Sequence, residues 1–348
     1  MNKNIKIWIG VGLVSLTVVS LALRLANPKE PTITPPITDQ PETPTVKDPV
    51  IRNIFNGREI EAEQDYQAFA IMIENTSAAR PHSGIGSADI VYEISVDGWA
   101  ISRFFAIFGN DHPNKVGPVR SARVPFAELQ KEWRLPFVHF GSAATGQGDA
   151  LSIIESLKLP IRFDGHKGIN DEFYSRDSSR NAPHNAYFNA ESALVKIPSL
   201  TYAPRFKYDD NSNVTDDDVS EIELKYSSSN KIDYLFNASD KTYSRFINDA
   251  PMMDLNTNTQ VKVTNIVVLH AKHWDAERVK YVLVDFVGEG KAEYFVNGKH
   301  EVGTWKKSSE TEITKYYDSE GKEVILLPGN TWIQVVHPSI SITKDGAK

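Results

Sequence analysis

The sequence predicts an α+β fold in two domains, a layered α/β first domain with a mixed or antiparallel sheet and a mostly-β second domain. Three observations lead to this prediction. Strand and helix patterns mix in the first half, nearly every segment of the second half alternates in polarity or is rich in β-branched residues, and an acidic stretch separates them. About 300 residues follow the amino-terminal segment, more than one average domain.

The amino-terminal segment, residues 1–27, predicts a membrane anchor or a signal sequence. Its apolar run at 7–23 would form about 25 Å of helix, which spans a ~30 Å hydrocarbon core only if residues 5–26 take part. Arg24 and the lack of a small-x-small cleavage site disfavour removal of the segment. We therefore favour an uncleaved anchor over a cleaved signal.

Residues 28–50 are rich in proline and threonine and predict an extended linker. The anchor and linker together predict a single-pass protein of the cell membrane, whose folded domains lie outside the cytoplasm. The positive-inside count supports this orientation only in part, because Arg24 and Lys29 follow the apolar run.

Composition excludes several classes of function. The chain has no cysteine, which rules out disulfides, thiolate metal sites, cysteine nucleophiles and lipid attachment through cysteine. The net charge of -7 argues against nucleic acid as a partner, because such proteins concentrate positive charge. The histidines show no metal-ligand spacing and the glycines form no phosphate loop, so we expect neither a metal nor a cofactor.

The first domain, predicted at 51–208, contains a clear strand pair. Residues 69–73 form a short apolar run, and residues 89–97 alternate strictly between polar and apolar side chains. An Asp-Gly turn then leads into a second apolar segment at 101–108. This order predicts an antiparallel hairpin.

Helical spacing and capping residues predict three helices in the same domain. Ser121 can cap a helix that runs to about Trp133, before a buried strand at 137–140. A second helix is expected at 149–157 and a third near 189–196, where Asn189 could act as the cap.

Residues 209–220 predict an acidic boundary loop, in which five aspartates stand among polar residues. The loop lacks the central glycine and terminal glutamate of an EF-hand, so a solvated linker is favoured over a calcium site. The second domain is predicted at 221–340 and contains no repeat of fixed period. Its expected strands are 221–226, 231–236, 242–247, 261–269, 279–286, 292–296, 313–317, 324–327 and 331–336.

Five arginines of the first domain lie near turns or element ends: Arg80, Arg103, Arg120, Arg123 and Arg180. Arg120 and Arg123 precede a predicted helix, whose free backbone N–H groups and dipole also favour an anion. Guanidinium groups there could grip a carboxylate or phosphate in bidentate fashion. The alternative is pairing with carboxylates of the same domain.

Carboxylates and histidines leave an enzymatic alternative open. Glu74 and Glu93 could meet across strands as the acid and base of a wall-polymer hydrolase. His184, near Asp177 and Arg180, is the histidine best placed for acid–base work. Enzymatic activity is therefore uncertain, and a non-catalytic protein is favoured.

Several segments together resemble the YerB-like family of bacterial envelope lipoproteins. They are AIMIEN (70–75), ARPHSG (79–84), ADIVYE (88–93), RFFAIF (103–108), GPVRSAR (117–123), APHNAY (182–187), GTWKK (303–307) and PGNTWI (328–333). The resemblance implies an extracytoplasmic protein of a Gram-positive-type envelope, with a layered α+β first domain and a β-rich second one. Since the family has no established activity, it implies no catalytic residue.

The chain departs from this family pattern in two places. Relatives often anchor through a lipidated cysteine, for which this chain has an apolar segment instead. Relatives also tend to carry a His-Ala-Gly-Gly type segment where residues 139–143 read HFGSA, so a role for that loop is not expected.

Some residues both match the family motifs and carry a chemical argument of their own. We expect them to bind an anionic or sugar-containing wall component, with a cell-wall polymer or an envelope protein as partner. A scaffold for envelope assembly that uses sheet edges is a further alternative. The predicted ligand-binding residues are Arg80, Glu93, Arg103, Arg120, Arg123, His184 and Asn185.

Overall fold

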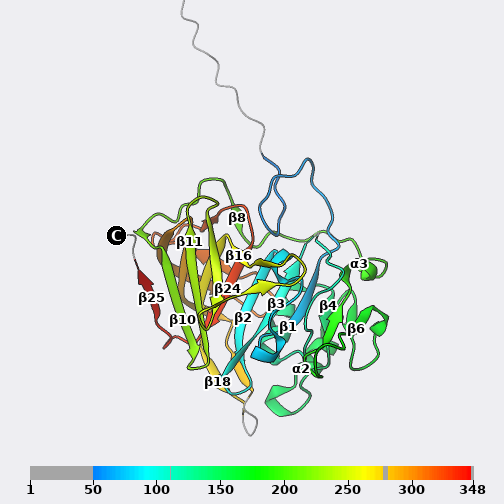
Figure 1. Ribbon diagram of the computed structural model, residues 1–348. Helices are drawn as coiled ribbons and strands as arrows, with labels where there is room; N and C mark the ends of the chain where they lie inside the picture. Colours follow the sequence, from blue (N-terminus) through cyan, green and yellow to red (C-terminus); the bar gives the residue numbers. More distant parts are fainter. Residues whose placement is uncertain (1–49, 110, 277–280, 346–348) are drawn as a thin grey trace, which may run out of the picture. The chain divides into compact units, whose positions relative to one another are not determined.

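Two β-sheets face each other across a hydrophobic core in the computed structural model, which describes residues 50–109, 111–276 and 281–345 (Figure 1). The predicted anchor at 1–27 lies outside the described residues, as does almost all of the predicted linker. Among the residues that are described, no helix is long and apolar enough to cross a membrane.

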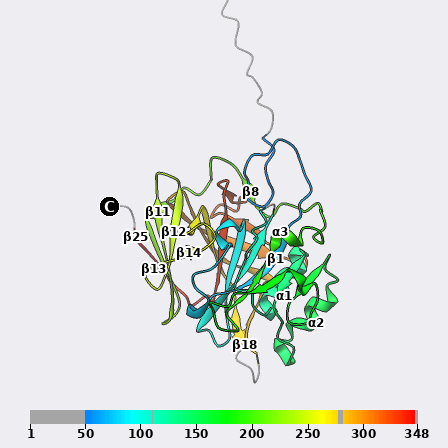
Figure 2. The ribbon, with the colours of Figure 1, turned by 45° about the vertical axis from the view of Figure 1, so that its right-hand side comes forward.

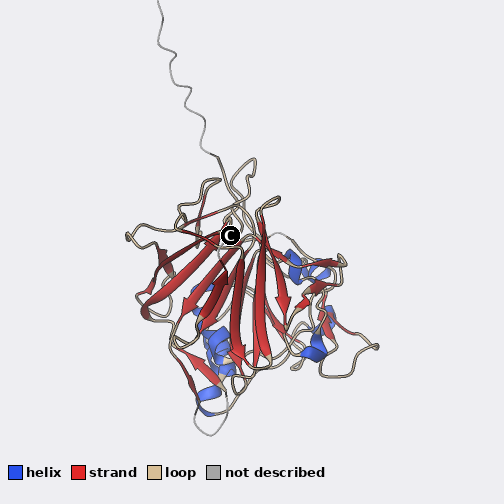
Figure 3. Cartoon of the chain, turned by 60° about the vertical axis from the view of Figure 1, so that its left-hand side comes forward, coloured by secondary structure: helices blue, strands red, loops and turns tan. Residues whose placement is uncertain are grey.

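The larger sheet has eleven strands and draws on both halves of the chain. Strands make up most of the regular secondary structure of the described residues, and the helices are few and short (Figure 3). A short strand, β9 (Asp217–Asp218), pairs with β21 outside the main path. The order along the path is β22 (Lys315–Tyr317), β21 (Lys299–Lys307), β20 (Gly288–Val296), β17 (Asn265–His270), β24 (Thr331–Val336), β2 (Ile90–Val96), β3 (Ile101–Phe108), β1 (Phe69–Glu74), β4 (Phe137–His139) and β5 (Arg162–Asp164).

Strand β24 joins the two halves of this sheet. It runs parallel to both neighbours, so that Thr331 lies opposite Ile90 of β2 and opposite Asn265 of β17. The predicted boundary at 209–220 therefore does not divide the sheet, and residues 49–348 form one compact unit. Local sequence patterns hide this arrangement because the paired strands lie far apart in the chain.

The smaller sheet packs on one face of the larger one. Residues of β1 such as Phe69 and Ile71 share a buried cluster with Ile222, Tyr234 and other residues of the smaller sheet. Strand β16 (Lys262–Val263) pairs with β12 outside the main path. The path order is β13 (Ala250–Pro251), β12 (Thr242–Ile247), β11 (Asn230–Asn237), β10 (Glu221–Ser227) and β25 (Ile342–Asp345).

Helices cover part of the opposite face of the larger sheet. In α1 (Val124–Trp133), Phe126 and Trp133 pack with Met72 and Phe105 of the sheet, and α2 (Ala150–Ser156) lies against α1 (Figure 2). The remaining elements are α3 (Ala190–Ala193), 3-10 helices at Ser77–Ala79, Ile85–Ser87, Gly146–Gly148 and Asp171–Phe173, and the pairs β14 (Met253–Asp254) with β15 (Thr259–Gln260), β18 (His273–Asp275) with β19 (Val282–Val284), β23 (Ile325–Leu326) with β8 (Lys207–Tyr208), and β6 (Tyr174–Arg176) with β7 (Ala186–Phe188).

The structure confirms the mostly-β character and the antiparallel pairing of β2 with β3. A separately layered α/β first domain is not seen, because α1 and α2 cover a sheet to which both halves contribute. The predicted cap Ser121 is wrong. Its hydroxyl donates to the carbonyl of Phe140, and Arg123 occupies the N-cap position without a side-chain cap.

Other differences concern short elements. The third helix spans only Ala190–Ala193, although Asn189 caps it as expected. The segment expected as one strand at 261–269 is two strands in different sheets, β16 and β17. Strand β21, among the longest in the sheet, has no counterpart among the predicted strands.

Candidate functional site

Glu74 is the centre of the best candidate site. It is the last residue of β1, its side chain is 1% exposed, and Arg103 lies opposite it on β3. Its Oε1 accepts hydrogen bonds from Thr76 Oγ1 at 2.8 Å and from His184 Nδ1 at 2.9 Å. Its Oε2 lies 3.3 Å from Nε of Arg120. We call Glu74, Arg120 and His184 the Glu74 cluster.

Two loops hold Arg120 and His184 against the end of β1. The backbone N–H of Arg120 donates to the carbonyl of Met72, and the N–H of Glu74 donates to the carbonyl of Pro118, so the segment 117–120 lies along the strand. The loop before β7 carries His184, whose backbone N–H donates to Asn181.

A third segment, residues 79–82, is hydrogen-bonded to the loop that carries His184. Arg180 Nη1 donates to the carbonyl of Ala79 and its Nη2 to the carbonyl of Pro81. His82 Nε2 donates to the carbonyl of Glu74 at 2.7 Å and fixes the end of β1 from the other side. Segments far apart in the sequence therefore converge on one carboxylate.

The cluster is buried at its base and open at its top. The side chains of Arg120 and His184 are 27% and 25% exposed, whereas Glu74 is buried. Among the described residues, the terminal nitrogens of Arg120 and Nε2 of His184 have no hydrogen-bond partner. Glu74 therefore orients two cationic or dipolar groups whose outer nitrogens remain available for a ligand.

A second ion-pair group lies beside the Glu74 cluster. Asp97, at the turn between β2 and β3, contacts Arg103 at 3.2 Å and Arg123 at 2.9 Å. Burial alone would raise the pKa of Asp97, but the hydrogen bond from Arg123 and the charge of Arg103 outweigh it and lower this pKa. Burial, together with the charge of Arg123, lowers the pKa of Arg103 to about 9.

This second group adds positive charge near the Glu74 cluster. Arg103 feels the charges of both Arg120 and Glu74, which places the two groups in one electrostatic neighbourhood. Three arginines there face two carboxylates, so the surroundings carry an excess of one positive charge. The guanidinium of Arg123 lies over the ring of Tyr281 at 4.8 Å.

Glu93 belongs to a different, closed network between the two sheets. Its Oε2 pairs with Arg245 Nη2 at 2.5 Å, and both side chains have no exposed surface. Its Oε1 accepts from Ser102 and from Asn75. Each oxygen of this carboxylate is occupied by protein groups, so the network has a structural role.

Two other predicted site residues also make protein contacts. Arg80 donates through Nε to the side-chain oxygen of Asn75 and through Nη2 to its carbonyl. Burial lowers the pKa of Arg80 to about 10, and the charge of Arg245 adds to this effect. Asn185 accepts from Arg176 and donates to the carbonyl of Arg180, so it braces the loop of His184.

Apart from Arg80 and Asn185, which brace loops, the predicted residues divide into three groups. The structure brings Arg120 and His184 together on Glu74, places Arg103 and Arg123 on Asp97, and turns Glu93 toward the core. The sequence indicates Glu74 only as a possible acid or base. Its position directly after the apolar run 69–73, as the last residue of β1, is the local signal for a site at this strand end.

The described residues include no group of three or more His, Cys, Asp or Glu side chains that could hold a metal ion. The Glu74 cluster has one carboxylate, and an arginine occupies the space beside it. Its chemistry is that of anion recognition or of proton transfer through His184.

Comparison with known protein families first defines the class of protein to which the chain belongs. Residues 55–203 match the family described as "Protein of unknown function (DUF3048) N-terminal domain", and residues 222–333 match the family described as its "C-terminal domain". The break between the two matches falls at the acidic stretch 209–220. The Glu74 cluster lies wholly within the first match.

The particular family follows from a sequence relative, YerB, whose crystal structure also shows the shared fold. The chain is 28% identical over 277 residues to "Putative lipoprotein YerB" of Bacillus subtilis strain 168, a match that covers 77% of this chain and 80% of the relative. The crystal structure of YerB protein from Bacillus subtilis has the same fold, with a TM-score of 0.71 at 24% identity over 84% of this chain and all of that one. The chain belongs to the YerB-like family, as the motifs indicated.

Proposed function

We propose that this protein is an extracytoplasmic envelope protein that binds an anionic group of a cell-wall component at the Glu74 cluster. The relative named as a lipoprotein supports an envelope location. The predicted anchor at 1–27 would hold the folded part at the outer side of the membrane, with the membrane itself as one partner.

One observation carries the ligand-binding part of the proposal. A buried carboxylate accepts a hydrogen bond from His184 Nδ1 and forms an ion pair with Arg120 Nε, while the outer nitrogens of both residues remain unpaired among the described residues. Two such groups, oriented from behind by the same carboxylate, suit a carboxylate or phosphate. The excess positive charge from Arg103 and Arg123 favours the same sign of ligand.

The test is a pull-down of the full-length chain with purified cell-wall polymer. Arg120→Ala should reduce the bound fraction about tenfold or more, because a charged hydrogen bond contributes about 1.5–3 kcal/mol. Arg162→Ala is the matched control, since Arg162 also pairs with a single glutamate at the surface. Equal binding by Arg120→Ala and the parent would refute the proposal. Competition with inorganic phosphate and with acetate separates the two kinds of anion.

A second function has a specific observation in its favour. The contact of 2.9 Å between Glu74 and His184 is the arrangement in which a carboxylate orients a histidine for general acid–base catalysis. Release of soluble fragments from purified wall polymer by the full-length chain, abolished in Glu74→Gln and in His184→Gln, would favour a hydrolase. Absence of turnover together with intact binding would favour the binding protein.

A further inference from the structure

A polar groove lies at the opposite end of the central strands from the Glu74 cluster. The groove has a volume of about 600 Å³, within the range of small-molecule sites. It opens where β2 begins, near Asp89, whereas Glu74 stands opposite Arg103 near the far end of β3. At about 3.3 Å per residue, the two sites are separated by roughly 17 Å of strand.

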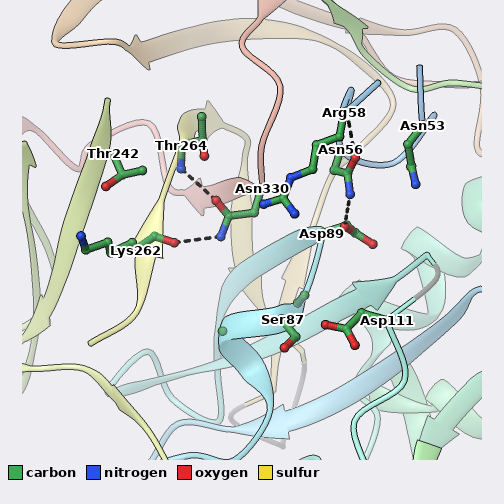
Figure 4. A pocket seen from close by; sticks show the side chains of 12 residues that line it. Asn53, Asn56, Arg58, Ser87, Asp89, Asp111, Thr242, Lys262, Thr264 and Asn330 are labelled. Atoms are coloured by element: carbon green, nitrogen blue, oxygen red, sulfur yellow. Dashed lines mark hydrogen bonds between the residues drawn. The ribbon is translucent and has the colours of Figure 1, made fainter. Parts of the chain in front are cut away.

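Segments that are distant in the chain build three walls of this polar groove (Figure 4). The loop 53–58 forms one wall, the segment 86–89 with Asp111 forms a second, and β12 with the residues around β16 and Asn330 forms a third. Asp89 and Asn330 come from the ADIVYE and PGNTWI segments, which the Glu74 cluster does not use.

Part of the lining is a fixed frame. Asn56 donates to Asp89 Oδ1 at 2.7 Å, while Asp89 Oδ2 accepts from the N–H of Gly109 at 2.6 Å. Asn330 accepts from the N–H of Thr264 and donates to the carbonyl of Lys262. These bonds hold the walls in place without the help of a ligand.

The other lining groups are free to bind. The guanidinium of Arg58, the carboxylate of Asp111 and the hydroxyl of Ser87 have no hydrogen-bond partner among the described residues. The side-chain nitrogen of Asn53 is also without one, although its oxygen accepts from the N–H of Phe55. The groove therefore presents donors and acceptors side by side.

The charges of the lining groups select the ligand class. Arg58 opposes binding of a cation, whereas the charge of Lys262 is already paired with Asp240 at 2.5 Å. Asp89 and Asp111 oppose binding of a multiply charged anion. Ala88 is the one lining residue with a hydrophobic side chain, so an apolar ligand would gain little. Hydroxyl groups, which both donate and accept, satisfy the free groups on all sides.

We propose that this polar groove is a second binding site, which takes a neutral carbohydrate of one to three sugar units. Arg58 and Asn53 donate to ring or hydroxyl oxygens of the sugar, and Asp111 and Ser87 accept from its hydroxyls. This site is independent of the anion site at the Glu74 cluster, so a result that contradicts one proposal does not contradict the other.

Calorimetric titration of the full-length chain, held in a detergent without a sugar head group, tests this proposal. The probes are two neutral trisaccharides, triacetylchitotriose and cellotriose. Saturable binding of either one is expected, with the affinity lowered about tenfold in Arg58→Ala and in Asp111→Asn, since each removes a hydrogen bond from a charged group. Both residues are exposed, so neither change disturbs the core.

Lys306→Ala provides a matched control, because Lys306 is an exposed cation away from the groove. It should bind the trisaccharide like the parent chain. Absence of binding for both probes at millimolar concentration, or equal affinity in all variants, would overturn the proposal. Tight binding of inorganic phosphate that is lost in Arg58→Ala would also overturn it, by showing an anion site. None of these outcomes bears on the pull-down with Arg120→Ala.

Discussion

Two buried glutamates of the larger sheet, Glu74 and Glu93, each form an ion pair with an arginine from another part of the chain, yet their surroundings differ. Glu93 meets a fully buried Arg245, and further protein donors occupy its other oxygen. Glu74 holds Arg120 and His184, which are each about a quarter exposed. The comparison teaches that a buried carboxylate alone does not mark a binding site. The marker is a partner whose outer nitrogens remain unpaired.

The largest effect should come from the closed network. Arg245→Ala should lower the free energy of unfolding by about 3–5 kcal/mol, because it leaves the charge of Glu93 buried without its partner. Denaturant unfolding of the parent and the variant measures this difference. A loss below about 1 kcal/mol would erase the distinction between the two glutamates.

The double variant Glu93→Met with Arg245→Met is the control for that experiment. Replacing both charges with apolar side chains removes the cost of burying them, so much of the lost stability should return. If the double variant is as unstable as Arg245→Ala, packing rather than charge explains the loss.

A pH effect should follow from His82, which lies between the two networks. Burial lowers the pKa of this histidine from 6.5 to about 3, although its bond to the carbonyl of Glu74 opposes the shift. Between these two values the unfolded chain binds a proton that the folded chain does not. Stability is therefore complete above pH 6.5 and falls as the pH drops from there toward 3.

From pH 7 to pH 5, His82 should account for roughly 1–2 kcal/mol of lost stability. Measuring the free energy of unfolding of the parent chain and of His82→Gln at both pH values isolates the part of the loss that is due to His82. Glutamine can still donate to the carbonyl of Glu74, but it does not titrate. The other buried histidines remain in both proteins. An identical loss in the two would show that His82 is not responsible.

The smallest effect on stability is expected at the open cluster. Arg120→Ala should change the free energy of unfolding by at most about 1 kcal/mol, because the arginine is partly exposed and water can take its place beside Glu74. Thermal unfolding measures this change alongside the pull-down. A large loss of stability would show that Arg120, like Arg245, has a structural role.

Local patterns in the sequence predict much of the fold but not its long-range pairing. The alternation at 89–97 and the following turn predict the β2–β3 hairpin, because both signals depend on neighbouring residues. Nothing local indicates that β24 lies between β2 and β17. Strand β21 was missed because its lysines and glutamate resemble those of a solvated segment.

The same limit applies to the candidate site. Arg120 and His184 were selected from motifs and residue chemistry, and the structure places both on Glu74. The pairing of Glu93 with Arg245 spans 152 residues and has no local signal. The polar groove was also out of reach, because its walls come from segments that meet only in the folded chain.

The position of β24 also has a consequence for biosynthesis. This strand is synthesised after both of its neighbours, β2 and β17, and it completes their hydrogen bonding. Until then, the facing edges of β2 and β17 remain unpaired and open to association with other chains. A product truncated before residue 331 would keep these edges exposed, so premature termination should yield aggregates rather than a working amino-terminal half.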